Sequence, residues 1–177
     1  MVVQLRQRVT LDEFEAFIAY PENAEKLFEF ISGEIIEVPS NPYVSKIAML
    51  IGATILFYLR ENDIGHVTGE AGGYMVGGER YAPDVAFISY DRQPELAVEV
   101  VSNGSNAEEQ RRLRFKLSSY LAVGVIVWVV NTEEHLVEVH QTGHAPQELG
   151  EGDILKAEAI LPEFKLAVKD IFPKKKS

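Results

Sequence analysis

The chain has 177 residues, of which 46% are hydrophobic and 25% charged, as expected for one globular domain. It has no cysteine, which excludes disulfides and cysteine-ligated zinc. The net charge of −10 argues against a protein that coats DNA, although carboxylates for a metal and a local basic patch are compatible with action on DNA. The N-terminus has no signal-peptide core, and no apolar run approaches the ~18 residues of a membrane helix. We therefore expect a cytoplasmic protein with no membrane partner.

The N-terminal third predicts a helix, a hairpin and a second, longer helix. Thr10 and Glu13 have capping-box spacing, so a short helix follows and ends before Pro21. Ser32-Gly33 separates two short runs, residues 27–31 and 34–38, which predicts a β-hairpin. Over residues 43–60, apolar side chains recur at helical spacing and predict a long helix with one face on a sheet. The inward positions expected for this helix are Ile47, Leu50, Ile51, Ile55 and Tyr58.

The middle of the chain predicts a sheet with one parallel strand pair. Short strands are expected at residues 66–68, 73–76, 84–89, 95–101 and 125–131. Between the last two strands, Ser105 to Glu108 resembles a capping box and Gly124 a helix stop, so the segment reads as a β-α-β unit. Towards the C-terminus we expect strands at residues 135–141 and 157–160, then a short helical turn within 164–172.

Glu99 is the most informative residue of the chain. Alternation along its strand places Ala97, Glu99 and Val101 on one face, and neither face has a solvated pattern. A carboxylate among such neighbours is costly unless a metal or another cation is close. The alternative is a carboxylate at a strand end that reaches solvent or one arginine.

Asp84 begins the preceding strand, directly after Pro83. If the two strands are neighbours, Asp84 approaches Glu99, and the two carboxylates repel each other unless Mg²⁺ lies between them. The alternative is an aspartate with a structural role in a turn or at the entry to the strand.

Lys116 lies on the helix between the parallel strands. Leu113 and Tyr120 place it at the border of the buried stripe, so it can turn towards the sheet that carries Glu99 or extend outward to solvent. Two carboxylates, a metal and a lysine form a set that activates water and neutralises a phosphate. The four histidines, residues 66, 135, 140 and 144, have no metal-ligand spacing, and the paired glycines at 72–73 and 77–78 open no phosphate-binding helix.

The chain resembles the Uma-type restriction endonuclease family, a branch of the PD-(D/E)XK nuclease superfamily. The similarity runs from about residue 10 to residue 172. The matching segments are residues 28–37, 81–88, 96–102, 116–120, 124–125, 128–130 and 161–164.

The resemblance implies one restriction-endonuclease-like domain over residues 1–177, with a mixed sheet flanked by helices. It implies that Asp84 and Glu99 bind Mg²⁺ or Mn²⁺. It also implies that Lys116 replaces the superfamily lysine, whose usual position is Val101 here, and that Glu34 is a further acidic member. The expected activity is metal-dependent hydrolysis of DNA phosphodiesters. By analogy, a homodimer would cut both strands.

Three positions depart from the family pattern. The Ser-Pro-Ser that is common after the second acid is Ser102-Asn103-Gly104-Ser105 here. Val44 stands where a histidine is common, and Asn131 stands where an aspartate is common. These changes leave open an inactive nucleic-acid-binding or protein-binding module on the same fold. A metal-dependent hydrolase of another phosphoester is the third hypothesis.

Overall fold

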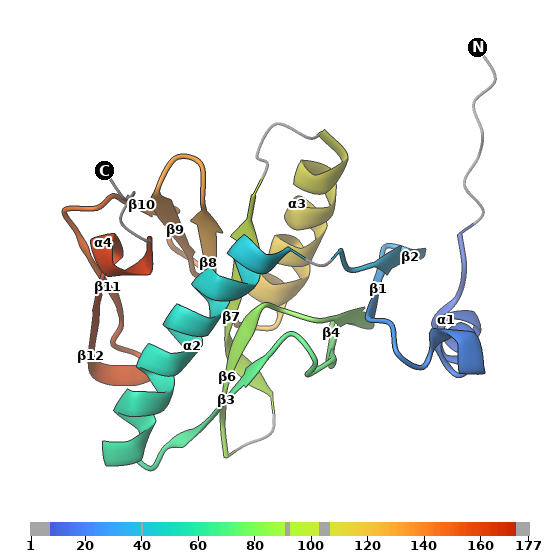
Figure 1. Cartoon of the computed structure of the whole chain (residues 1–177), viewed down its shortest axis with the longest axis horizontal. Helices are drawn as coiled ribbons and strands as arrows, with labels where there is room; N and C mark the ends of the chain where they lie inside the picture. Colours follow the sequence, from blue (N-terminus) through green and yellow to red (C-terminus); the bar gives the residue numbers. More distant parts are fainter. Residues whose placement is uncertain (1–7, 40, 91–92, 103–106, 173–177) are drawn as a thin grey trace.

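The computed structural model describes residues 8–39, 41–90, 93–102 and 107–172, arranged as a mixed α/β fold around a six-stranded sheet (Figure 1). The strand order is β10-β9-β8-β7-β6-β3. Among the strand pairs of the described residues, only β7 and β8 are parallel, and α3 (Ala107–Ala122) lies between them in the chain, as the β-α-β prediction required. The strands are β3 (Gly65–Gly69), β6 (Val85–Ser89), β7 (Pro94–Val101), β8 (Ile126–Asn131), β9 (Leu136–His140) and β10 (Gln147–Leu149).

The central sheet is covered by a helix on each face. Helix α2 (Pro42–Glu61) packs on the face that carries Val98 and Trp128, and α3 packs on the face that carries Ala97 and Val127. The β8 strand is buried from Ile126 to Val130, as expected of a strand covered on both sides. The predicted alternation of β7 is therefore confirmed, and it directs Glu99 towards α3.

A smaller sheet packs beside α3 and brings the N-terminal hairpin to the site. Its order is β2-β1-β5-β4, where β1 (Phe28–Ile31) and β2 (Glu34–Glu37) form the predicted hairpin. Ser32 and Gly33 both have positive φ, as a tight hairpin turn requires. Strands β4 (Tyr74–Val76) and β5 (Glu79–Tyr81) complete the sheet. Helix α1 (Leu11–Ile18) has the predicted Thr10–Glu13 capping box and packs on β1, and a short 3-10 helix, η1 (Pro21–Asn23), follows it.

The C-terminal part differs from the sequence expectation. A two-stranded sheet of β11 (Ile154–Ala157) and β12 (Leu161–Ala167) precedes α4 (Val168–Ile171). The expected strand at 157–160 is wrong, since these residues lie mostly in the turn between the two strands. The expected capping box of α3 lies outside the described residues, whereas Gly124 ends α3 with a positive φ as predicted.

Helix α2 departs from expectation on its outer side. Ile47, Ile51 and Ile55 are buried as predicted, but Leu50 is exposed. The prediction for Leu50 is wrong because α2 carries apolar residues on all sides, so their spacing does not define one buried face. Within the described residues, α2 alone has the length and apolar composition that a membrane-spanning helix needs. The sequence analysis did not detect this because it considered only uninterrupted apolar runs. Its inner side belongs to the protein core.

Candidate active site

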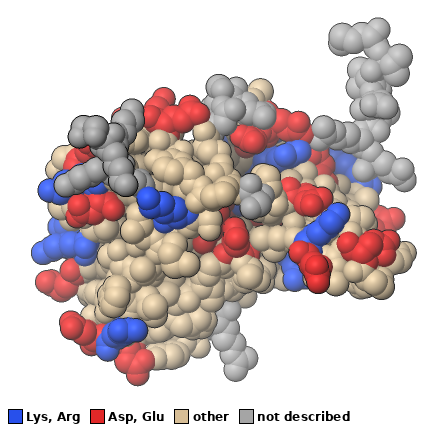
Figure 2. Space-filling model, in the orientation of Figure 1, with Lys and Arg blue, Asp and Glu red and all other residues tan. Residues whose placement is uncertain are grey.

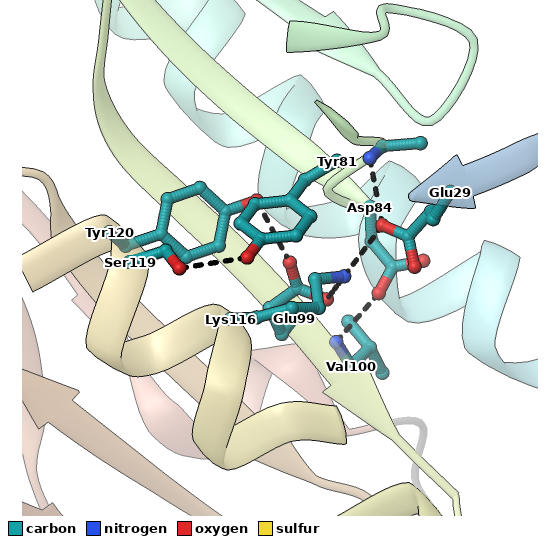
Figure 3. Close-up of polar contacts among 9 residues, drawn as sticks. Glu29, Tyr81, Asp84, Glu99, Val100, Lys116, Ser119 and Tyr120 are labelled. Atoms are coloured by element: carbon teal, nitrogen blue, oxygen red, sulfur yellow. Dashed lines mark hydrogen bonds and ion pairs between the residues drawn. The ribbon is translucent and has the colours of Figure 1, made fainter. Parts of the chain in front are cut away.

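Glu99 and Lys116 form a buried ion pair between β7 and α3 (Figure 3). Glu99 is 7% exposed and Lys116 is 6% exposed. The Lys116 Nζ donates to Oε2 of Glu99 at 2.5 Å, and the Tyr120 hydroxyl donates to Oε1 at 3.2 Å. The predicted convergence of strand and helix is therefore present, and the lysine turns towards the sheet.

Glu29 joins the same ion pair from the N-terminal hairpin. Its Oε1 accepts from Lys116 Nζ at 2.8 Å and from the backbone N–H of Ala82, also at 2.8 Å. Lys116 is thus held between two buried carboxylates from different sheets. Glu29 was missed in the sequence because only the packing of the second sheet brings it here. The pattern Phe28-Glu29-Phe30 was its one local signal, a carboxylate between two aromatic residues in a strand.

Asp84 lies at the start of β6, next to the Glu99 segment of β7. Its Oδ2 accepts the backbone N–H of Val100 at 2.7 Å. The antiparallel register pairs Val85 with Val98, which brings the residues that follow Val98 alongside Asp84. Asp84, Glu99, Lys116 and Glu29 all line one pocket of about 300 Å³. Of these four residues, all but Glu29 were candidates from the sequence.

Burial and like charge disfavour the ionised forms of the two predicted metal ligands. Burial raises the pKa of Asp84 to about 6, although the Val100 N–H and Lys116 oppose this shift. Burial also raises the pKa of Glu99, against the effect of Lys116, and Glu29 and Asp84 add to the rise. Glu29 and Glu99 hold the pKa of Lys116 above its usual value despite burial, so the ammonium stays charged. A further cation at this site would stabilise both carboxylates.

Two tyrosines complete the wall behind Lys116. The Lys116 Nζ lies 5.7 Å from the centroid of the Tyr81 ring, whose hydroxyl donates to Ser119 at 2.9 Å. Burial raises the pKa of Tyr81 to about 12 and that of Tyr120 well above its usual value. Both phenols therefore remain hydrogen-bond donors at neutral pH.

Glu34, expected as a further acidic member, is not brought into this group. Its carboxylate accepts from Arg111 Nη2 at 2.9 and 3.2 Å, so it tethers the hairpin to α3. The four histidines, all in the described part of the chain, also lie outside the pocket.

The departures from the family pattern fall in different places, and residues 103–105 lie outside the described residues. Val44 lines the pocket and presents an aliphatic side chain where a histidine is common in the family. Asn131 is the last residue of β8, and its Oδ1 accepts the backbone N–H groups of Glu133 and Glu134. Asn131 therefore caps a turn, whereas the Val44 change alters the pocket.

The donor set fits a hard divalent cation in its chemistry. Carboxylate oxygens are the ligands that Mg²⁺ prefers, and Asp84 and Glu99 both line the pocket. In the part of the chain that the structure describes, no three His, Asp or Glu side chains are arranged as a metal site. One or two protein carboxylates with water and substrate oxygens are the usual ligands of Mg²⁺ at phosphoryl-transfer sites, and Asp84 with Glu99 would supply two.

Comparison with known proteins bears on the fold and the family of the chain. A crystal structure described as a "putative nuclease belonging to DUF820", from Anabaena variabilis ATCC 29413, matches with a TM-score of 0.78 and 20% identity. The match covers 93% of this chain and 97% of that chain, so the fold is restriction-endonuclease-like. No curated protein matches the chain. The Uma2 family model, described as "Putative restriction endonuclease", matches residues 12–169. Because this match spans most of the sequence, the chain belongs to the Uma2 family of restriction-endonuclease-like proteins.

Proposed function

We propose that the protein is a Mg²⁺-dependent endonuclease that hydrolyses DNA phosphodiesters. The observation that carries this proposal is the gathering of Asp84, Glu99 and Lys116 in one pocket from two strands and a helix. Buried charges of this kind are expensive to keep, and a purely apolar core would be at least as stable. Their presence in a pocket, with raised carboxyl pKa values, is typical of a functional site.

Asp84 and Glu99 would hold the metal through their carboxylates. When bound, Mg²⁺ supplies positive charge to the phosphate oxygens and lowers the pKa of a water molecule. Lys116 would orient the attacking water or neutralise the pentacovalent phosphate, since its ammonium lies 2.5 Å from Glu99. Glu29 is a positioning residue, because it accepts from the same ammonium and fixes its direction.

Arg112 lies at the rim of the pocket, and its free donor is evidence for a phosphate substrate. It lines the pocket beside Lys116, and its Nη2 donates to Glu108 at 2.8 Å. Among the residues that the structure describes, its buried Nε lacks a hydrogen-bond partner. A phosphate oxygen would supply the acceptor that this donor needs. A local cation of this kind can bind DNA although the net charge of the chain is −10.

Nicking of supercoiled plasmid DNA tests the proposal. With Mg²⁺ or Mn²⁺ the protein should convert supercoiled plasmid to open-circular or linear DNA, and EDTA should stop the conversion. Glu99→Gln should lose the conversion. Its matched control, Glu138→Gln, should behave as wild type, because Glu138 lies on β9, outside the pocket. Equal conversion with and without EDTA would reject the role of the metal.

A binding module without turnover is the second candidate. Both Glu99 oxygens already accept hydrogen bonds, from Lys116 and Tyr120, and Val44 places methyl groups in the pocket. DNA binding measured by anisotropy, without cleavage under any divalent metal, would support that candidate over the nuclease.

A further inference from the structure

Tyr120 is the neutral donor among the groups that hold the buried carboxylate of Glu99. Figure 2 shows charged side chains spread over the surface of the molecule, whereas Glu29, Glu99 and Lys116 are the charged residues buried in the described part of the chain. A buried carboxylate without donors is costly, so the groups that donate to it determine how it is held. Within the described residues, two side chains donate to Glu99, and they are Lys116 and Tyr120.

The two donors hold different oxygens of Glu99 (Figure 3). Lys116 Nζ donates to Oε2 at 2.5 Å, and the Tyr120 hydroxyl donates to Oε1 at 3.2 Å. One hydrogen bond alone lets a carboxylate rotate about that contact, whereas donors at both oxygens fix its plane. Each carboxylate oxygen has two lone-pair sites, so one donor at each oxygen still leaves lone pairs for a metal.

We propose that Tyr120 is a positioning residue that fixes the Glu99 carboxylate for the metal. The inference rests on the function proposed above, in which Asp84 and Glu99 bind Mg²⁺. Hydrogen-bond partners of metal-binding side chains orient the ligand, and their loss typically weakens metal binding about 10- to 100-fold. Asp84 has a comparable partner, because the backbone N–H of Val100 donates to its Oδ2 at 2.7 Å. Both proposed metal ligands are thus held by a donor of the protein.

Helix α3 supplies both donors from one face. Tyr120 is four residues after Lys116, so the two side chains lie one turn apart on the same side of the helix. The helix is anchored at this point, because the Tyr81 hydroxyl of β5 donates to Oγ of Ser119 at 2.9 Å. Donors on an anchored helix hold a ligand more firmly than donors on a loop.

The packing around the Tyr120 ring keeps its hydroxyl directed at Glu99. The ring is fully buried, and its centroid lies 5.2 Å from that of the Tyr81 ring. Ala97 and Val127 of the central sheet belong to the same buried apolar cluster. Close packing of this kind disfavours other rotamers of Tyr120. A phenylalanine would fill the same space, so packing alone does not account for the hydroxyl.

Calorimetric titration of the full chain with Mn²⁺ tests this role on a matched pair of tyrosine variants. Tyr120→Phe keeps the ring and removes the donor to Glu99, so Mn²⁺ binding should weaken at least about tenfold. Tyr58→Phe is the control and should bind Mn²⁺ as tightly as wild type. Tyr58 lies on α2 outside the pocket, and its hydroxyl donates to the backbone carbonyl of Pro162 at 2.7 Å. Equal Mn²⁺ affinities for Tyr120→Phe and wild type would overturn the proposal.

Plasmid nicking at rising Mn²⁺ concentration separates a loss of metal affinity from a loss of fold. Excess Mn²⁺ should bring the rate of Tyr120→Phe close to that of wild type, because this variant retains the charge of Glu99. The same excess should not rescue Glu99→Gln. A Tyr120→Phe defect that excess Mn²⁺ does not reduce would assign the hydroxyl to the stability of the core and overturn the positioning role. Loss of the folded circular dichroism spectrum in Tyr120→Phe would overturn it in the same way.

The titration also distinguishes failure of this role from failure of the proposed function. Wild type that binds no Mn²⁺ would reject the metal-dependent nuclease and, with it, the role of Tyr120. Wild type that binds Mn²⁺, together with an undiminished affinity in Tyr120→Phe, would reject the role of Tyr120 alone.

Discussion

The ammonium of Lys116 donates to Glu99 and to Glu29, so one buried cation is shared by two carboxylates that belong to different sheets. Glu29 comes from the N-terminal hairpin and Glu99 from the central sheet, 70 residues later in the chain. The shared lysine thus ties the hairpin to β7. Any change at this position is expected to affect folding and chemistry together.

Lys116→Met should destabilise the protein strongly. It leaves Glu29 and Glu99 buried without their cation, and removal of one partner of a buried ion pair typically costs about 3–5 kcal/mol. Chemical denaturation at neutral pH measures this loss. The deficit should shrink at acid pH, where both carboxylates can take up protons. A loss that does not change with pH would show that packing, not charge, is responsible.

The pKa of Asp84 gives the metal-free protein a specific pH dependence. Because burial raises this pKa from 3.8 to about 6, the folded state holds the proton more tightly than the unfolded state. The stability from Asp84 is therefore fully present at pH values below about 4. This contribution to the free energy of unfolding decreases as the pH rises from about 4 to about 6, and the total decrease is about 3 kcal/mol.

Asp84→Asn should remove that pH dependence. In EDTA at neutral pH the variant should melt no lower than wild type, because Asn can still accept the Val100 N–H without an unfavourable charge. Asp170→Asn is the matched control, since Asp170 is exposed on α4. Thermal melts over a pH series measure both variants. A wild-type stability that rises between about pH 4 and pH 6, relative to Asp84→Asn, would contradict the shift.

Mg²⁺ or Mn²⁺ should raise the melting temperature of wild type and leave Asp84→Asn nearly unchanged. A ligand that binds only the folded state stabilises it by about 2.7 kcal/mol at a hundredfold excess over Kd. The effect should weaken at acid pH, where protons compete for Asp84 and Glu99. Differential scanning fluorimetry with each metal measures the shift. Wild type without any shift at millimolar metal would reject metal binding at this pocket.

Arg112→Ala should weaken DNA binding at the pocket rim. The loss of one phosphate contact should reduce the slope of log K against log salt by about one. Arg114→Ala is the matched control, because Arg114 also lies on α3 but lines a different pocket. Fluorescence anisotropy with duplex DNA over a salt series measures both. Equal slopes for the two variants would show that Arg112 does not bind a phosphate.

Much of the site could be predicted because local periodicity determines it. Strand alternation identified the face of Glu99, and the helical phase of Lys116 placed it at the buried stripe. Glu29 could not be predicted, because its role depends on how the hairpin sheet packs on α3. The family resemblance instead implied Glu34, whose carboxylate pairs with Arg111.

The errors in the fold have comparable physical causes. The sequence did not predict β5 or β10. Each strand is three residues long, which is too short for an alternation of apolar and polar residues to be visible. Leu50 was assigned to the core because apolar residues occur all round α2, and only the position of the sheet shows which side is covered.

Cleavage by Glu99→Gln, measured with the stability of the variant, tests the central claim most directly. Gln keeps the volume of Glu99, and Lys116 keeps Glu29 as its partner, so the fold should be nearly unchanged. The loss of the carboxylate charge should lower metal-dependent cleavage by on the order of 10²-fold or more. A folded Glu99→Gln variant that cleaves DNA at the wild-type rate would contradict the account, and the binding module would replace it.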